Sequence, residues 1–424
     1  MLRSTRIVER CREIARCTEV AGQTTRAFLS PPMHAVHGLL RGWMEAAGMH
    51  VRVDAIGNLR GVYPAHDGVD RPRLLIGSHL DTVPNAGAFD GVLGVVMGVA
   101  LVEELRGERL PFAIEVIGFS EEEGVRFSKP FLGSLALIGE LDDALLGRRD
   151  QLGVSVTDAV RAFGLDSAGL AEAALADGEA FGYLELHIEQ GPVLEKEHQS
   201  LGIVEAIVGQ GRFELTFLGQ ANHAGTTPMR LRHDAMAAAA AWIVAVEQYA
   251  RERDGLVATV GRVETKPGAG NVIPGEVVAT LDVRHAEDVV RKQAVTELLV
   301  EAERAAAARG VRVTRRELME QAAVPMDAGL SERLIKAAKH TGHDARRMVS
   351  GAGHDAMIVA RKVPSAMLFL RSPAGLSHHP EESVLTTDVE AALATGLEFL
   401  RGLGDDGTRL EKQATRGGVK NGNP

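Results

Sequence analysis

The sequence predicts an α/β protein in which an α/β/α domain is interrupted by an inserted ferredoxin-like α+β domain. Two observations predict it. Short apolar runs typical of buried strands occupy residues 73–77 and 112–120, and an apolar helix that begins at Gly91 lies between them. Further along, residues 212–319 follow the order strand, helix, strand, strand, helix, strand of a ferredoxin-like sandwich. Because such a unit closes on itself, it can be inserted between two parts of another domain.

The main domain shows its elements in turn. The first 70 residues predict helices, then a strand near residues 51–53 and a turn at 56–58. The alternation of strand, helix and strand over residues 73–120 is typical of a sheet with parallel strands. Apolar runs at 183–187 and 365–370 predict two more strands of the same kind.

The inserted domain begins with an alternating strand at 212–219. Asp234 is an expected N-cap for a long alanine-rich helix that ends near residue 253. Strands at 256–264 and 276–284, a helix at 287–309 and a strand at 311–318 follow. We therefore expect a main domain over 1–211 and 329–403, an inserted domain over 212–328, and a polar, disordered tail over 404–424.

The composition argues against several classes of protein. A net charge of -10 without a dense basic stripe argues against nucleic acid as a partner. Two cysteines in one helical segment, Cys11 and Cys17, exclude a disulfide framework and fit a cytoplasmic location. No signal segment is visible at the start of the chain. The most apolar stretch, residues 91–105, contains glycines and ends in charges, so we expect a buried helix and no membrane partner.

Polar residues follow four predicted strands of the main domain. In α/β sheets, ligands bind at the carboxyl ends of strands, and such residues meet there. Imidazoles and carboxylates together are the ligands of zinc and related divalent ions. The residues concerned are His79, Asp81, Asp90, Glu121, Glu122, Glu123, His187, Glu189, Gln190, His378 and His379.

Each cluster alone has an ordinary explanation. His79 could be a hydrogen-bonded structural histidine, and His378 could lie at the surface. The residues after His187 could form only a strand-ending turn. Three consecutive glutamates usually form a solvated turn, but here they follow an apolar strand, where adjacent carboxylates repel each other unless a cation lies near. The coincidence of all four clusters at strand ends favours a metal site.

Eight stretches resemble the M20 metallopeptidase-related amidohydrolases, in the hydantoinase/carbamoylase branch that contains N-carbamoyl-L-amino acid hydrolases, β-ureidopropionase and allantoate amidohydrolase. HIEQG and NHAGTTPM are specific to this branch, whereas His-x-Asp is shared with the wider peptidase group. The stretches run in family order over about residues 77–382: GSHLDTVPNAGAFDG, FSEEEGVRF, LELHIEQGPVLE, ANHAGTTPM, NVIPGEV, DVRH, SGAGHDAM and GLSHHPEE.

The resemblance implies two divalent ions, Zn or else Mn, Co or Ni. His79 and His187 would complete a first site and Glu122 and His378 a second, with Asp90 bridging the two ions. The resemblance makes Glu121 the general base that activates the attacking water and gives Asp81 the task of orienting the imidazole of His79.

The resemblance also implies four substrate contacts: Gln190 from the main domain, and His223, Asn271 and Arg284 from the inserted lid or dimerisation domain. Arg284 suits a bidentate grip on a carboxylate, and His223 and Asn271 could donate to the developing oxyanion. In the family, His223 and Asn271 would be delivered from the partner subunit, which implies a homodimer. The SGAGHDAM stretch is a family hallmark, but we assign no role to its side chains.

We therefore expect a cytoplasmic binuclear-metal amidohydrolase. It would cleave the ureido or carbamoyl C–N bond of a small carboxylate, an N-carbamoyl-L-amino acid or allantoate, and release ammonia. RSPAGLSHHPEE favours allantoate slightly. One alternative is a dipeptidase or aminoacylase of the same superfamily, against which HIEQG and Arg284 argue. Another is a non-enzymatic binding protein, against which the presence of every expected ligand and of Glu121 argues.

Overall fold

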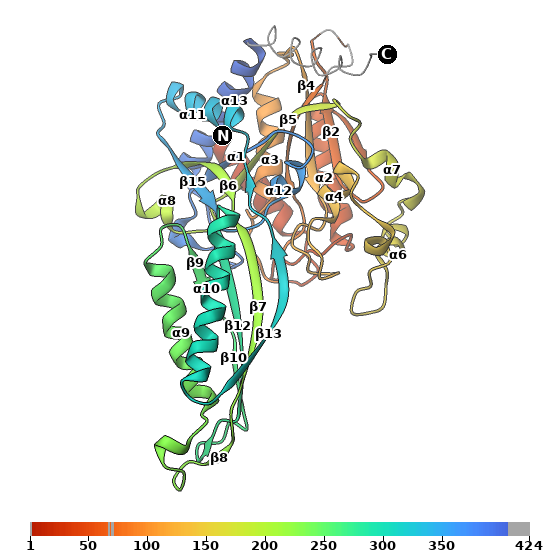
Figure 1. Cartoon of the computed structure of the whole chain (residues 1–424). Coiled ribbons are helices and arrows are strands. Elements are labelled where there is room, and N and C mark those ends of the chain that lie inside the picture. Colours follow the sequence, from red (N-terminus) through yellow and green to blue (C-terminus); the bar gives the residue numbers. More distant parts are fainter. Residues whose placement is uncertain (1, 67, 69–71, 406–424) are drawn as a thin grey trace, which may run out of the picture. The chain divides into compact units, whose positions relative to one another are not determined.

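The computed structural model describes residues 2–66, 68 and 72–405, which form two units (Figure 1). One unit takes the chain up to Glu205 and from Met326 onward, and the other comprises Ala206–Pro325. The sequence predicted these boundaries a few residues later, after 211 and 328, because it gave no sign of the strand over Leu201–Ile207 that leads into the second unit. The tail predicted over 404–424 lies outside the described residues, except for 404 and 405 at the end of the last helix.

A mixed sheet is the centre of the first unit. Within the described residues it has nine strands in the order β1-β2-β4-β3-β5-β16-β6-β14, with β15 beside β6. Strand β3 pairs in parallel with β4 and β5, and β5 pairs in parallel with β16. The strands are β1 (His50–Val53), β2 (Leu59–Tyr63), β3 (Arg73–His79), β4 (Ala113–Phe119), β5 (Ala180–Ile188), β6 (Leu201–Ile207), β14 (Val324–Pro325), β15 (Ala345–Ser350) and β16 (Ser365–Leu370).

The helix predicted after Gly91 is α3 (Val92–Glu104), and every residue from Val92 to Val102 is buried. Its glycines let it approach the sheet closely: a Cβ on Gly98 would lie 3.0 Å from Val116 and 3.2 Å from Ile76. No helix among the described residues is long and apolar enough to cross a membrane. The other helices of this unit are α1 (Arg3–Ala15), α2 (Pro32–Ala46), α4 (Leu132–Ile138), α5 (Asp143–Leu146), α6 (Val156–Ala162), α7 (Leu170–Ala173), α8 (Val193–Lys196), α11 (Ala328–His340), α12 (Asp355–Val359) and α13 (Thr386–Asp405).

Charged side chains are buried inside this sheet. Arg60 of β2 donates from Nε to Glu115 Oε1 of β4 at 2.6 Å, and Arg73 of β3 donates to Glu115 Oε2 at 3.0 Å. Glu115 is fully buried and Arg60 is 1% exposed. Removing one member of such a cluster leaves an uncompensated charge in the core.

The second unit has the predicted ferredoxin-like order. Its sheet runs β10-β12-β7-β13, with β9 beside β12, and α9 and α10 cover one face of it (Figure 1). The side chain of Asp234 caps α9 by accepting from Ala237 N, as predicted. The strand expected over 256–264 is divided into two. The elements are β7 (Gly209–Leu218), α9 (Ala235–Arg251), β9 (Val257–Thr259), β10 (Val263–Lys266), β12 (Glu276–His285), α10 (Asp288–Ala307) and β13 (Arg312–Gln321), with β8 (Asn222–His223) and β11 (Val272–Ile273) as a separate small pair. The α/β class with an inserted α+β unit is confirmed.

Candidate metal centre

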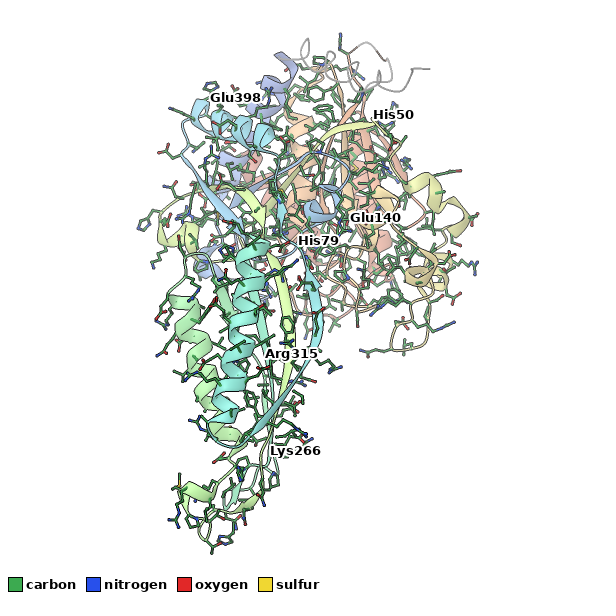
Figure 2. All side chains as sticks on the ribbon, viewed as in Figure 1. His50, His79, Glu140, Lys266, Arg315 and Glu398 are labelled. Carbon is green, nitrogen blue, oxygen red and sulfur yellow. The ribbon has the colours of Figure 1, made fainter. Side chains whose placement is uncertain are left out.

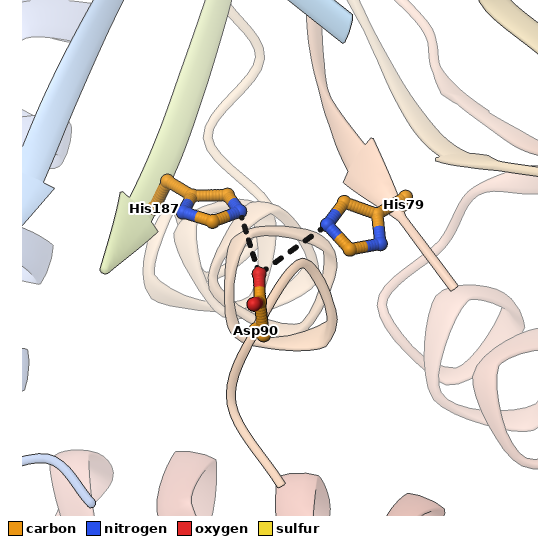
Figure 3. A group of neighbouring side chains, drawn as sticks. All are labelled: His79, Asp90 and His187. Atoms are coloured by element: carbon orange, nitrogen blue, oxygen red, sulfur yellow. Dashed lines mark ion pairs between the residues drawn. The ribbon is translucent and has the colours of Figure 1, made fainter. Parts of the chain in front are cut away.

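The polar residues predicted at strand ends meet beside one another in the first unit. His79 is the last residue of β3 (Figure 2), and His187 is the next-to-last residue of β5 (Figure 3). Both are buried. The three glutamates follow β4, and His378 follows β16. These four strands are neighbours in the sheet and run parallel, so their carboxyl ends share one edge.

The carboxylate of Asp90 lies among three imidazoles. Figure 3 shows its Oδ1 between the rings of His79 and His187. This oxygen is 3.5 Å from His79 Nε2 and 3.2 Å from His187 Nε2, whereas Oδ2 is 3.3 Å from His378 Nε2. The two oxygens thus face different imidazoles. This is the arrangement that a carboxylate bridging two ions requires.

The ligand atoms gather in overlapping groups. One group is His79, Asp90 and His187, and another is Asp90, Glu123 and His378; within each, the ligand atoms lie within 4.8 Å of one another. Glu123 Oε1 is 3.5 Å from His378 Nε2. Because both groups contain Asp90, they describe two adjoining cation positions.

The protonation of the imidazoles tests whether cations fit there. His79 Nδ1 lies 3.0 Å from the carbonyl of Asp81, and His187 Nδ1 lies 2.9 Å from that of Ile188. A carbonyl only accepts, so each Nδ1 carries a proton, and the neutral form of each imidazole presents its Nε2 lone pair to Asp90. Asp90 Oδ1 and His187 Nε2 are buried and have no hydrogen-bond partner among the described residues. Lone pairs that face each other across a buried gap fit a bound cation.

The negative charges around the imidazoles also favour a bound cation. Burial lowers the pKa of His79, but the close carboxylate of Asp90 and the negative charges of Glu122 and Asp81 outweigh it and raise that pKa well above its usual value. The hydrogen bond with Asp90 also raises the pKa of His378. A field that favours protons on imidazole favours metal ions at the same nitrogens, so the two compete for this site.

The three glutamates after β4 have different surroundings. Glu121 Oε1 accepts from the backbone N of Arg126 at 3.0 Å and of Phe127 at 3.4 Å, so its side chain closes the turn after β4. Glu121 belongs to none of the ligand groups in the described part of the chain, whereas Glu122 groups with His79 and Glu123.

The base role expected at Glu121 and the ligand role expected at Glu122 therefore stay predictions, and the geometry adds Glu123 as a further candidate ligand. Glu121 has a φ of 54°, which bends the chain so that the next two carboxylates face the site. Three identical side chains in a row give no sign of this bend, so the sequence alone does not show which of the glutamates face the site.

Burial sets the protonation of these carboxyls. Burial and the neighbouring Glu123 charge raise the pKa of Glu122 well above its usual value, although His79 opposes them. Burial also raises the pKa of Glu123 to about 7. A cation between these groups would relieve their mutual repulsion.

Asp81 positions the imidazole of His79 and also the backbone of two glutamates. Its carbonyl accepts from His79 Nδ1, and its carboxylate accepts from the backbone N of Glu122 and of Glu123, each at 3.0 Å. The His-x-Asp motif thus fixes residues of both cation positions from one short segment.

The position after Asp90 requires a glycine, Gly91, because it lies close to the ring of His79. Its φ is 67°, and a Cβ there would lie 2.5 Å from the His79 ring carbons Cδ2 and Cε1. Any other residue at this position would therefore displace a candidate ligand.

The HIEQG stretch contributes a hydrogen bond and a helix cap besides His187. Gln190, expected to contact substrate, donates from Nε2 to Asp90 Oδ2 at 3.0 Å. Glu189 accepts from the backbone N of Val193 at 2.7 Å and of Leu194 at 3.0 Å, and so caps α8. This stretch thus holds the carboxylate of Asp90 at Oδ2, whereas the imidazoles of His79 and His187 face Oδ1.

Comparison with known proteins identifies the family. Residues 75–404 match the family described as Peptidase family M20/M25/M40.

The chain belongs to the M20 family. This M20 chain is 39% identical over 427 residues to allantoate deiminase of Arabidopsis thaliana, which covers 93% of this chain and 81% of that one. It is 39% identical over 385 residues to N-carbamoyl-L-amino acid amidohydrolase of Geobacillus stearothermophilus, covering 90% and 94%. A hydantoinase/carbamoylase family amidase from Burkholderia multivorans superposes with a TM-score of 0.89 at 30% identity, covering 95% and 98%. The family resemblance read from the motifs is confirmed, and the M20 chain is a hydrolase.

The second unit of this M20 chain carries the other expected substrate residues. His223 in β8 pairs with Val272 in β11, and the carbonyl of Asn271 accepts from Ala224 N at 2.9 Å, so His223 and Asn271 lie at neighbouring positions of one small pair of strands. Both residues are exposed.

Two further details bear on how these residues could bind a substrate. His223 Nδ1 accepts from the backbone N of Gly225 at 3.0 Å, which leaves the proton on Nε2. Arg284 of β12 donates from Nε to Asp282 Oδ1 at 2.8 Å and from Nη2 to Oδ2 at 3.2 Å. Asp282 therefore already binds the guanidinium in the bidentate way in which arginine binds a carboxylate.

Sequence reasoning gave no role to Glu123 or to two buried residues behind the site. Glu185 accepts from Ser78 Oγ at 3.0 Å, from Tyr183 OH at 3.1 Å and from Ala356 N at 2.8 Å. His354, 1% exposed, packs its ring 4.6 Å from that of His187. A charged residue inside the apolar strand run YLELH was the available signal for Glu185.

Proposed function

We propose that the chain is a binuclear-metal amidohydrolase that cleaves the ureido or carbamoyl C–N bond of a small carboxylate and releases ammonia. The observation that carries this proposal is the bridging position of Asp90, whose two oxygens face different imidazoles. Relatives named for allantoate and for N-carbamoyl-L-amino acids are equally similar at 39% identity, so we propose the substrate class that the two share.

In this proposal His79, Asp90 and His187 hold one ion, and Asp90, Glu123 and His378 hold the other. Imidazole and carboxylate ligands suit zinc, and also manganese, cobalt or nickel. When bound, the ions would polarise the substrate carbonyl and lower the pKa of the attacking water.

We propose Glu122 as the general base. Its carboxylate lies beside His79 and Glu123, with ligand atoms within 4.8 Å, a gap that one water spans with hydrogen bonds of about 2.8 Å on either side. It would take the proton of the attacking water and return it to the leaving nitrogen. Glu123 cannot do so, because its carboxylate is engaged as a ligand.

The substrate contacts in the proposal come from Gln190 and from the second unit. Arg284 would bind the substrate carboxylate, in place of or beside Asp282. His223 and Asn271 would donate to the developing oxyanion from the partner subunit, which makes the proposed enzyme a homodimer. The proton on Nε2 of His223 supports its role as a donor. We also propose a cytoplasmic location, which the free thiols of Cys11 and Cys17 fit.

Ammonia release tests the proposed function. Metal-stripped protein is reloaded with each candidate ion and given N-carbamoyl-L-amino acids, allantoate and β-ureidopropionate, with N-acetyl amino acids and dipeptides as controls. We expect metal-dependent ammonia release from at least one ureido carboxylate. Cleavage of dipeptides or N-acetyl amino acids alone would instead support the peptidase or aminoacylase alternative.

A further inference from the structure

Glu382 ties together two loops that each carry a proposed metal ligand. It follows His378 in the loop after β16 and is 5% exposed. Its Oε1 accepts from the backbone N of Phe89 at 2.9 Å and of Asp90 at 3.0 Å, in the loop that leads into α3. One carboxylate oxygen thus binds the peptide N–H of the proposed bridging ligand.

The loop lies so close to Glu382 that its sequence is constrained. A Cβ added to Gly87 would lie 2.5 Å from Glu382 Oε1 and 2.6 Å from Glu382 Cδ. Ser377 Oγ donates to Asp90 Oδ2 at 3.0 Å and lies 3.5 Å from Glu382 Oε2. Asp90 is therefore held at its backbone by Glu382 and at its carboxylate by the same loop.

The distance between His378 and Asp90 needs an interaction that links their two loops. His378 lies outside helix and strand, has a φ of 55°, and its side chain is 49% exposed. Loop packing alone gives little to fix its distance from Asp90, whereas a ligand pair must be held within a few tenths of an ångström.

We propose that Glu382 is a positioning residue, which fixes the bridging carboxylate of Asp90 relative to His378 through the two hydrogen bonds that its Oε1 accepts. The proposal rests on the proposed metal centre. It requires an acceptor atom at the reach of a glutamate side chain and does not require a negative charge.

Two variants separate reach from charge. Glu382→Gln keeps a carbonyl oxygen at the same reach and loses the charge. Glu382→Asp keeps the charge and withdraws the acceptor by about one C–C bond length, roughly 1.5 Å. Glu381→Ala is the matched control, because Glu381 is the exposed neighbour in the same motif.

The experiment titrates metal-stripped full-length protein with Zn²⁺ against a chromogenic chelator. We expect Glu382→Asp and Glu382→Ala to weaken at least one of two binding steps by about 10- to 100-fold, the usual loss when a partner of a metal ligand is removed. Glu382→Gln and Glu381→Ala should stay within about threefold of wild type on the same scale.

Three results would overturn the proposal: normal zinc binding in Glu382→Asp, loss of binding in Glu382→Gln with Glu382→Asp intact, or equal loss in Glu381→Ala. A purely structural role would lower the thermal stability of Glu382→Asp while its folded fraction still bound zinc normally. Wild-type protein that binds two ions but cleaves no ureido compound would refute the proposed function alone. Wild-type protein that binds fewer than two ions would refute both.

Discussion

Replacing Glu122 by Gln tests which glutamate moves the proton. The change keeps the size of the side chain and removes its ability to accept a proton. General bases contribute about 10²- to 10⁴-fold to enzyme rates, which is about 3–5 kcal/mol of activation free energy. We expect kcat to fall by that factor while both ions stay bound, because in our proposal Glu123, and not Glu122, is the ligand.

Glu121→Gln is the matched control, and the structure predicts little effect. The amide oxygen can still accept from the backbone N of Arg126 and of Phe127. Burial raises the pKa of Glu121 to about 8, so its carboxyl is already mostly neutral at pH 7 and a neutral amide changes the local charge little. We expect kcat within about threefold of wild type, with a stability cost of at most about 1–3 kcal/mol for the buried amide group.

The assay combines ammonia release with metal content by elemental analysis for both variants and for Glu123→Gln, which should lose an ion. If Glu121→Gln lost turnover a hundredfold with both ions bound while Glu122→Gln stayed active, the geometric argument would fail. The general base predicted from the sequence alone would then be supported.

Three further predictions address the ligands, the substrate and the core. Gly91→Ala should displace the ring of His79 and lower zinc stoichiometry, measured by elemental analysis; two bound ions in this variant would contradict the contact argument. Arg284→Ala should raise KM for carboxylate substrates by about 100-fold, the equivalent of roughly 3 kcal/mol for a charge-assisted pair, and an unchanged KM would remove it from the substrate site. Glu115→Ala should lower the free energy of unfolding by about 3–5 kcal/mol in urea denaturation, because the buried Arg60 loses its closest carboxylate and keeps Asp54 at 3.9 Å; a loss below about 1 kcal/mol would mean that Asp54, water or other groups compensate that charge.

The sequence predicted the elements of the fold better than the details of the site. Apolar runs locate β3, β4, β5 and β16, and the strand-end rule brings His79, Asp90, His187 and His378 to one edge. These signals are local and periodic, so a single sequence carries them.

The remaining details depend on tertiary geometry. The choice among three adjacent glutamates depends on the backbone of Glu121, whose positive φ is not a property of glutamate. Glu382 accepts a hydrogen bond from the backbone N of Asp90, which lies 292 residues away in the sequence, and no local pattern predicts that contact. The strand β6 pairs with β16, β15 and β14, all far along the chain, so its place in the sheet of the first unit follows from no local pattern.

The order of the proposed ligands along the chain determines when each becomes available during synthesis. His79, Asp90 and His187, whose side chains face each other, all precede the second unit, whereas His378 follows it. The second unit has a hydrophobic cluster of its own and closes on itself. During translation, the ribosome therefore releases the three proposed ligands of one cation position early, and the other proposed position is complete only when nearly the whole polypeptide has emerged.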